Sequence, residues 1–420
     1  MGSGKTHVAC IIARALNVPT LVVCPKVLIG MWERVAREKG TEVSACNWEK
    51  IRAGNSPYGT WVEDKKRKVI FQWSDAIKFL ILDEVQKAKG TKTQNAAVAF
   101  AARRQKIPVL ALSATAAISP LDMRALGYIL GLHNGNDFYR WIRNHGCRPG
   151  NWGGFEFTGS GWHSSFAAKD GKDRVMQKLH KEIFPAKGFR IRVSEVPDFP
   201  ETQITAELLD ISDPEKLDAL YAEMQEALAR LREKKSQDSD PENPLTRLLR
   251  ARQQVELLKC PLFVSMAEDA LEQDMSVAIF VDFRDTMNEI CKKLNTECRV
   301  DGLTLLAARE ANIERFQRDE ERVLVAISSA GGIGVSLHDL NGNHPRLSLI
   351  SPGFDARILR QVLGRVHRTG AKTKSIQRIL FAAKTVEEQI HKSVAVKLNC
   401  LDQLNNGDLS LPNLQLSEAA

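Results

Sequence analysis

The predicted fold is decided by two stretches of sequence, 1-MGSGKT-6 at the start of the chain and 361-QVLGRVHR-368 far downstream. In the first, glycines let backbone N–H groups approach phosphate oxygens, Lys5 neutralises the β- and γ-phosphates, and the Thr6 hydroxyl is suited to ligate magnesium. The second supplies arginines suited to the same γ-phosphate. Because phosphoryl transfer spreads charge over the equatorial oxygens, a cation from a second lobe would speed hydrolysis and couple it to lobe closure. The pair therefore predicts a two-lobed motor ATPase.

Length and composition narrow the class further. A chain of 420 residues predicts two lobes of about 200 residues each. The net charge of +8 favours nucleic acid as a partner. The eight cysteines form no Cys-x-x-Cys pair, which argues against a zinc site and for reduced core thiols. The sequence shows no signal peptide and no apolar run of roughly 18 residues, so we expect a soluble intracellular protein with no membrane partner. Its compartment would be the cytoplasm of a prokaryotic or infected cell, or a eukaryotic nucleus.

Short apolar runs alternate with helical stretches in the first part of the chain. Such runs, bounded by turns, are typical of buried parallel strands. They are 19-PTLVVCP-25, 78-KFLILDE-84 and 107-IPVLALSAT-115, and the expected helices cover about 5–16, 27–39, 92–105 and 120–131. This alternation predicts an α/β fold with a doubly wound parallel sheet flanked by helices, in which ligands bind at the carboxyl ends of the strands.

The rest of the chain divides into an insertion, a second lobe and a tail. Residues 133–190 carry no periodic core signal, and we expect a helical or irregular insertion on the first lobe. A strand at 201–212, an amphipathic helix to about 234 and a polar loop at 235–244 are expected next. A second βα-alternating lobe is predicted by the runs 276–283, 298–302, 322–328, 346–352 and 375–383. The predicted domains are 1–200 and 201–403, followed by a tail at 404–420.

Acidic and hydroxyl residues follow the predicted strands of the first lobe. Asp83 is suited to hold magnesium and Glu84 to polarise the attacking water. An acidic pair after a strand also suits a helix N-cap and first turn, but Lys5 and Thr6 on the same sheet favour the catalytic interpretation. The stretch 113–115, Ser-Ala-Thr, becomes a candidate link from the nucleotide site to the other lobe.

Aromatic residues gather in 149-PGNWGGFEFTGSGWH-163. They are suited to stack on bases, but a small hydrophobic cluster that pins the insertion to the lobe is favoured. The residues concerned are Trp152, Phe155, Phe157 and Trp162, with Phe166 just after this stretch. No metal site is expected at His145, Cys147 and His163.

Five motifs in order resemble those of superfamily 2 helicases, and the SWI/SNF-type branch is the most similar. Residues 1–6 look like Walker A, 83-DEVQ-86 like Walker B, 113–115 like the third motif, 330-AGGIGVSL-337 like the fifth and 361-QVLGRVHRTG-370 like the sixth. The resemblance covers nearly the whole chain. It implies a viral, phage-like or bacterial member of a family of DNA-dependent ATPases.

The resemblance also implies the fold, ligands and residue roles. We expect two RecA-like lobes with ATP and Mg²⁺ at the cleft between them, in a helicase or translocase that tracks DNA in preference to RNA, together with replication, repair or transcription proteins. The implied nucleotide-binding residues are Gly2, Ser3, Gly4, Lys5, Thr6, Asp83 and Gly334, of which Thr6 and Asp83 hold the metal. The implied catalytic residues are Glu84 for the water, Gln361 as γ-phosphate sensor, and Arg365 and Arg368 as arginine fingers on one face of a helix. Nucleic acid would contact residues 25–33, 47-NWEKI-51 and the segments after Phe280 and Ser328.

Three features depart from the family pattern. Gln86 stands where histidine is usual and Ser336 where asparagine is usual, and both are mild polar changes. The chain starts inside Walker A, so we expect it to be N-terminally truncated, to lack the strand before Gly2 and to bind ATP poorly alone. The alternatives are an RNA-dependent helicase and a catalytically impaired nucleic-acid-binding fragment.

Overall fold

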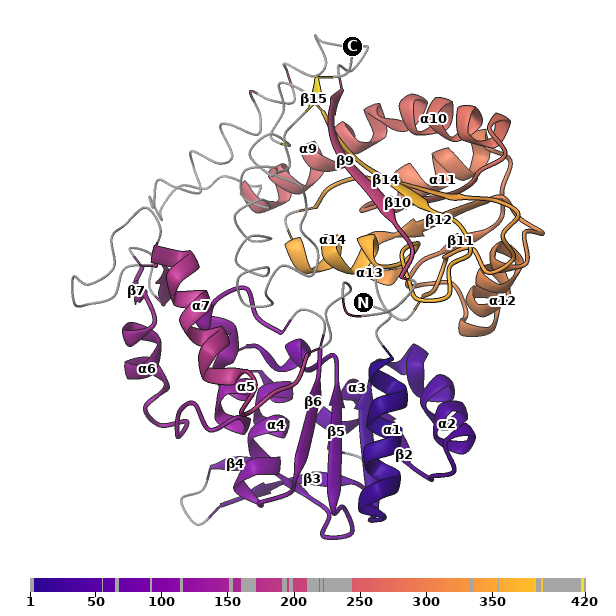
Figure 1. The fold of residues 1–420 in the computed structure, drawn as a ribbon. Helices are drawn as coiled ribbons and strands as arrows, with labels where there is room; N and C mark the ends of the chain where they lie inside the picture. The colour runs from indigo at the N-terminus through magenta and orange to yellow at the C-terminus, as the bar shows by residue number, and fades with distance from the viewer. Residues whose placement is uncertain are drawn as a thin grey trace. The chain divides into compact units, whose positions relative to one another are not determined.

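The chain forms two compact units (Figure 1). The first contains Ser3–Val196, which we name lobe 1, and the second contains Pro197–Val396, which we name lobe 2. The computed structural model describes residues 4–54, 56–64, 68–90, 93–113, 116–150, 154–159, 171–190, 195, 199–209, 219, 222, 244–331, 335–353, 355–382, 387 and 417–418.

Lobe 1 is built on a parallel sheet of four described strands in the order β2-β1-β5-β6. The three predicted strands are present as β1 (Thr20–Cys24), β5 (Phe79–Asp83) and β6 (Val109–Leu112). Every residue of β1 and β5 is buried, as expected for central strands of a parallel sheet. The sequence did not predict β2 (Ser44–Asn47), because its short, largely polar run lacks an apolar signal.

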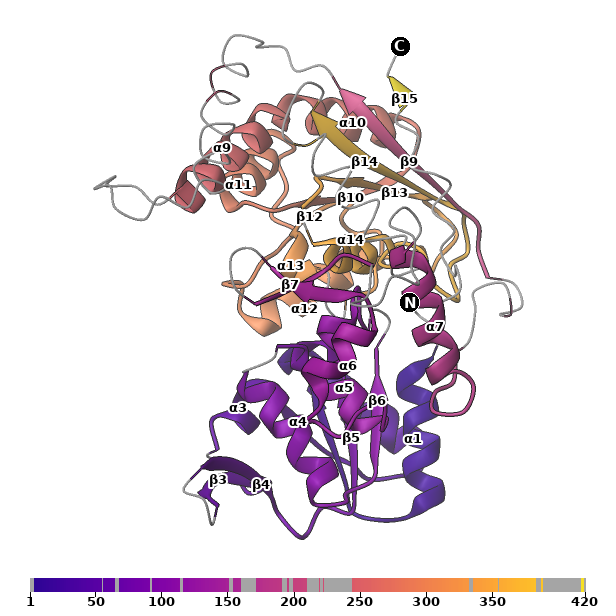
Figure 2. The same ribbon diagram turned by 90° about the vertical axis from the view of Figure 1, so that its left-hand side faces the viewer.

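The predicted helices of lobe 1 are also present. They are α1 (Lys5–Leu16), α2 (Ile29–Glu38), α4 (Gln94–Arg104) and α5 (Arg124–Ile129), with 3₁₀ turns leading into α2 and α5. A short helix, α3 (Trp48–Arg52), and an antiparallel hairpin of β3 (Gly59–Glu63) and β4 (Val69–Trp73) were not predicted. The hairpin buries Phe71 and Trp73 and packs through β4 against α4 (Figure 2).

The insertion at 133–190 is more regular than the sequence predicts. Its described residues form α6 (Phe138–Asn144), a hairpin of β7 (Cys147–Pro149) and β8 (Phe155–Phe157), and α7 (Gly171–Ile183). The helices α6 and α7 confirm the helical part of the predicted insertion, whereas the short β7–β8 hairpin was not predicted. Phe155 and Phe157 pack against the core of lobe 1, as a pinning cluster requires, while Trp152, Trp162 and Phe166 lie outside the described residues.

Lobe 2 contains a sheet of seven described strands, all paired in parallel, in the order β11-β12-β10-β13-β14-β9-β15. All six predicted strands are present, and the added strand is β15 (Ser417–Glu418) in the predicted tail. The predicted six are β9 (Thr202–Leu209), β10 (Ser276–Val281), β11 (Arg299–Val300), β12 (Val323–Ile327), β13 (Arg346–Ile350) and β14 (Ser375–Ala382). Apart from residues 219 and 222, which are helical, the helix expected to 234 lies outside the described residues, as do the loop at 235–243 and the tail at 404–416. The α/β fold class predicted from the sequence is confirmed.

Helices connect the strands of lobe 2. They are α9 (Pro244–Leu258), α10 (Cys260–Glu272), α11 (Arg284–Lys293), α12 (Leu306–Gln317), α13 (Ser328–Gly331) and α14 (Ala356–Leu363). Helices α9, α10 and α11 pack against one another (Figure 1). All seven cysteines in the described part of the chain are buried and free of disulfides, as expected for core thiols. Among the described helices, none has the length and apolar character needed to cross a membrane.

A buried ion pair lies in the core of lobe 2. The Lys259 ammonium, 0% exposed, donates to the two carboxylate oxygens of Glu387 at 2.7 and 3.0 Å. It also donates to Ser351 Oγ at 3.0 Å, and Glu387 accepts the backbone N–H of Ala382 at 2.7 Å. Both charges are thus hydrogen-bonded, which is the condition under which a buried ion pair is tolerated.

Lys259→Met should therefore lower the free energy of unfolding by about 3–5 kcal/mol, because it leaves the Glu387 carboxylate buried without a cation. Urea denaturation of the full chain measures the loss. The double variant Lys259→Met/Glu387→Leu removes both charges and should recover most of it. A double variant no more stable than the single one would contradict this account of the pair.

Candidate nucleotide site

Lys5 and Thr6 open helix α1. The residue before them, Gly4, caps the helix with a φ of 72°, in the left-handed region that glycine adopts without Cβ strain. The free backbone N–H groups and the dipole at a helix N-terminus attract phosphate oxygens. Gly2 and Ser3, also predicted to bind phosphate, lie outside the described residues. The described start of α1 therefore has the chemistry of an anion site.

Asp83 ends strand β5 and is only 5% exposed. The Trp32 indole N–H donates to its Oδ2 at 3.1 Å, and the backbone N–H of Glu84 donates to its Oδ1 at 3.0 Å. Burial, and then the charge of Glu84, raise the pKa of Asp83 to about 6, whereas the charge of Lys5 and the Trp32 hydrogen bond lower it. The fold thus lets the charge of Lys5 act on the Asp83 carboxylate.

Glu84 begins a chain of hydrogen bonds that leads from β5 to the neighbouring strand β6. The Gln86 amide donates to Glu84 Oε2, and the Ser113 hydroxyl donates to Gln86 Oε1 at 2.6 Å. Glu84 has φ 52° and ψ 49°, a strained left-handed conformation of the kind often found at active sites. Although Glu84 precedes a 3₁₀ turn, its side chain does not cap it. The geometry therefore favours a role in the site over the helix-cap interpretation. Ala114 and Thr115 lie outside the described residues.

The residues at this end of the sheet suit magnesium. Mg²⁺ prefers oxygen ligands, keeps several waters and is bound through one or two protein oxygens together with substrate phosphates. Asp83 offers a carboxylate and Thr6 a hydroxyl of this kind. Within the described ranges no cluster of three His, Cys, Asp or Glu side chains could hold a metal, so an all-protein metal cage is not available there.

Arg365 of the sixth motif lies in the turn that follows α14, and Arg368 lies just after this turn, so neither arginine is on a helix. The prediction that they share a helix face is wrong, because α14 ends at Leu363 and Gly364 follows it. Backbone N–H groups of Gly364 and Arg365 donate three residues back, to Gln361 and Val362, which tightens the chain into the turn.

Both arginines nevertheless converge on the fifth-motif segment. Arg365, 3% exposed, donates through Nη1 to the Val335 carbonyl at 2.8 Å and through Nε to the Gln361 carbonyl at 2.8 Å. Arg368 is less buried and donates through Nη1 to Ser336 Oγ at 2.5 Å. The charges of Arg368 and Arg346 add to burial in lowering the pKa of the nearby His338 to about 4, so the imidazole is neutral at pH 7. Gly334 lies outside the described residues.

The two residues that depart from the family pattern are thus bonded to predicted catalytic residues. Gln86 holds Glu84, and Ser336 holds Arg368. Sequence reasoning treated both as mild polar changes and missed these contacts. It also missed the indole donors on Asp83. A buried tryptophan predicts that its indole N–H has a hydrogen-bond acceptor, but the sequence does not identify that acceptor.

The stretch 47–51, predicted to contact nucleic acid, forms most of α3. Asn47 Oδ1 accepts the backbone N–H of Lys50 at 2.8 Å and caps the helix. Trp48 is fully buried, and its indole N–H donates to the backbone carbonyl of Asp83 at 3.0 Å. The Trp48 side chain is therefore unavailable to nucleic acid, and the prediction is wrong for this residue. Glu49 and Lys50 are exposed, so contact through them stays a prediction.

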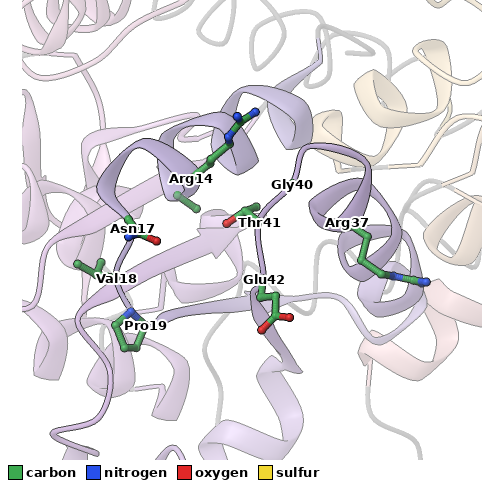
Figure 3. Close-up of a pocket in the computed structure, with 9 residues that line it drawn as sticks. Arg14, Asn17, Val18, Pro19, Arg37, Gly40, Thr41 and Glu42 are labelled. Atoms are coloured by element: carbon green, nitrogen blue, oxygen red, sulfur yellow. The ribbon is translucent and has the colours of Figure 1, made fainter.

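A pocket of 680 Å³ lies at the other end of α1 (Figure 3). Arg14 and Asn17 line the pocket from the end of α1, and Pro19 lines it just before β1. Arg37 contributes from the last turn of α2, and Glu42 from the segment after that helix. The phosphate-loop helix start and Asp83 belong to the opposite ends of α1 and of the sheet. The pocket is therefore separate from the nucleotide site.

Comparison with known proteins places this chain in a family. Residues 259–370 match the model of the helicase conserved C-terminal domain. A protein of Acanthamoeba polyphaga mimivirus that carries the name of an ATP-dependent RNA helicase is 31% identical over 99% of this chain and 81% of its own length. A Caenorhabditis elegans homologue of the SWI/SNF-related, matrix-associated, actin-dependent regulator of chromatin, subfamily A-like protein 1, is 24% identical over 96% of this chain and 58% of its own.

Among solved structures, the C-terminal part of the Fun30 ATPase domain is 13% identical, with a TM-score of 0.37, and the match covers 50% of this chain and 99% of that one. The family model and the mimivirus relative show that the chain is a helicase-type ATPase. The chain belongs to the SWI/SNF-type branch of the superfamily 2 helicases, whose members hydrolyse ATP and bind nucleic acid.

Proposed function

We propose that this chain is a DNA-stimulated ATPase that hydrolyses Mg²⁺–ATP and moves along duplex DNA. The observation that carries the proposal is the buried Asp83 carboxylate at the end of β5, which is hydrogen-bonded at both oxygens, lies next to the strained Glu84 and feels the charge of Lys5 at the start of α1. A phosphate-neutralising cation, a metal-binding carboxylate and a second carboxylate for water are the parts that phosphoryl transfer to water requires.

Each lobe supplies different groups in this proposal. In lobe 1, Lys5 neutralises the phosphates, Thr6 and Asp83 hold Mg²⁺, and Glu84 orients and deprotonates the water. Lobe 2 supplies Gln361 as γ-phosphate sensor and two arginines that stabilise transition-state charge, Arg365 and Arg368. When bound, the metal neutralises charge on the phosphate oxygens. Hydrolysis would then depend on both lobes, which is how turnover becomes coupled to movement.

The net charge of +8 favours an anionic polymer of either kind, and the choice of DNA over RNA rests on the resemblance to SWI/SNF-type ATPases. The second candidate is an RNA-dependent helicase. It is favoured by one observation, the name of the mimivirus relative, which describes that protein as acting with RNA. Both candidates share the nucleotide chemistry described above and differ only in the polymer that stimulates it.

The affinity for duplex DNA compared with that for duplex RNA distinguishes the two candidates, and the salt dependence of binding tests for phosphate contacts. For the full chain, fluorescence anisotropy with duplex DNA and duplex RNA of one sequence should show tighter binding to DNA. The logarithm of the DNA affinity should fall linearly with the logarithm of salt concentration, by a slope of about 0.9 per phosphate neutralised. Equal affinity for both duplexes would remove the DNA preference, and tighter RNA binding would favour the second candidate.

A further inference from the structure

Two tryptophans from different helices end on one residue, Asp83. Trp32 comes from α2 and Trp48 from α3, and both side chains are 0% exposed. The indole of Trp32 donates to the side-chain Oδ2 at 3.1 Å, and that of Trp48 donates to the main-chain carbonyl oxygen at 3.0 Å. The Trp32 indole therefore binds the carboxylate of Asp83, whereas the Trp48 indole binds only its backbone.

The carboxylate of Asp83 is held at both oxygens. The Trp32 indole binds Oδ2, and the backbone N–H of Glu84 binds Oδ1. Two donors on opposite oxygens fix the rotation of the carboxylate plane. Both donors are neutral, so the negative charge is not cancelled by an ion pair. An ionised carboxylate has about four acceptor sites, so acceptor sites remain for a hydrated cation.

We propose that Trp32 is a positioning residue for magnesium, because it holds the Asp83 carboxylate in the rotation that receives the hydrated ion. The inference rests on the proposed role of Asp83 in binding Mg²⁺. Groups that orient a metal-binding side chain are worth about 10–100-fold in metal affinity or activity. An indole suits this task, since it is a rigid donor with no acceptor group and its ring is fixed by the surrounding core.

The test compares Trp32→Phe with Trp48→Phe in the full chain. Each removes one indole N–H from a fully buried site and leaves a smaller aromatic ring, so the damage to packing is similar. Titration calorimetry gives the affinity for ADP in Mg²⁺ and in EDTA, and their ratio is the magnesium contribution. We expect Trp32→Phe to reduce this ratio at least about 10-fold and to leave the EDTA affinity unchanged. Trp48→Phe should keep the ratio, because its bond ends on the backbone.

The outcomes separate this inference from the proposed function. An unchanged ratio in Trp32→Phe, or an equal loss in Trp48→Phe, would overturn the positioning role and leave the nucleotide site standing. If the unsubstituted chain binds ADP no better with Mg²⁺ than with EDTA, the magnesium site itself fails and the inference fails with it.

A spectroscopic readout covers the case in which Trp32→Phe does not fold. Selective ¹⁵N labelling of tryptophan gives one indole signal for each of the seven tryptophans. Adding Mg²⁺ to the ADP-loaded, unsubstituted chain should shift an indole signal, because the acceptor of the Trp32 bond gains a cation. Indole signals that all stay in place would overturn the proposal.

Discussion

Glu84→Gln should bind ATP as tightly as the unsubstituted chain and hydrolyse it about 10²–10⁴-fold more slowly. A positioned general base contributes about this factor, and glutamine cannot take up the proton of the attacking water. Glutamine has nearly the same shape, so its side chain still fits beside Gln86, which donates to Glu84 in the structure. Single-turnover kinetics measure the rate, and calorimetry with a non-hydrolysable analogue measures the affinity.

The matched control is Glu63→Gln, the same change at an exposed carboxylate on the β3–β4 hairpin. It should leave turnover and ATP affinity as they are. If Glu84→Gln retains more than about a tenth of the turnover, Glu84 is not the base that activates water.

Arg368→Ala should reduce turnover by about 10³–10⁵, because an arginine finger stabilises the transition-state charge by that factor. Arg368 is half-buried and donates to the Ser336 hydroxyl and the Gly364 carbonyl, so its loss should disturb the fold less than the loss of the buried Arg365. Arg365→Ala should reduce turnover as much and also lower the thermal midpoint. Its guanidinium is buried and satisfies the carbonyls of Val335 and Gln361.

Arg318→Ala serves as the control, since Arg318 is an exposed arginine of the same lobe, at the end of α12. Its turnover should equal that of the unsubstituted chain. Steady-state turnover and thermal unfolding of the three variants separate catalysis from stability. An Arg368→Ala variant that hydrolyses ATP within tenfold of the unsubstituted rate would exclude Arg368 as a finger.

The local sequence was sufficient to predict elements whose buried or functional residues follow one another along the chain. The apolar runs at 20–24 and 79–83 became fully buried strands because both faces of a parallel sheet are covered. The start of α1 at Lys5 followed from Gly4 and the residues after it. Strand β2 was missed because its short polar run leaves only a weak periodic signal, whereas β4, Val-Ile-Phe-Gln-Trp, has the apolar and aromatic composition of a strand and could have been predicted.

Contacts between distant residues could not be predicted. Asp83 and Glu84 were identified from their motif, but the donor Trp32 lies 51 residues earlier, and nothing in either segment indicates that the two meet. At Arg365, in contrast, the sequence led us to predict regular structure that is absent there. A helix was extrapolated through Gly364 from spacing alone, whereas the structure ends α14 before it and lets the next residues bend toward Val335 and Ser336.

The central claim is that nucleic acid, and duplex DNA above all, drives ATP hydrolysis by this chain. The most direct measurement is steady-state ATP turnover of the full chain with duplex DNA, with duplex RNA and with no nucleic acid, each at low and at high salt. We predict that DNA raises turnover most, that RNA raises it less, and that the increase fades as salt weakens the phosphate contacts. Equal turnover under all three conditions would contradict the account and leave an ATPase without a nucleic-acid track.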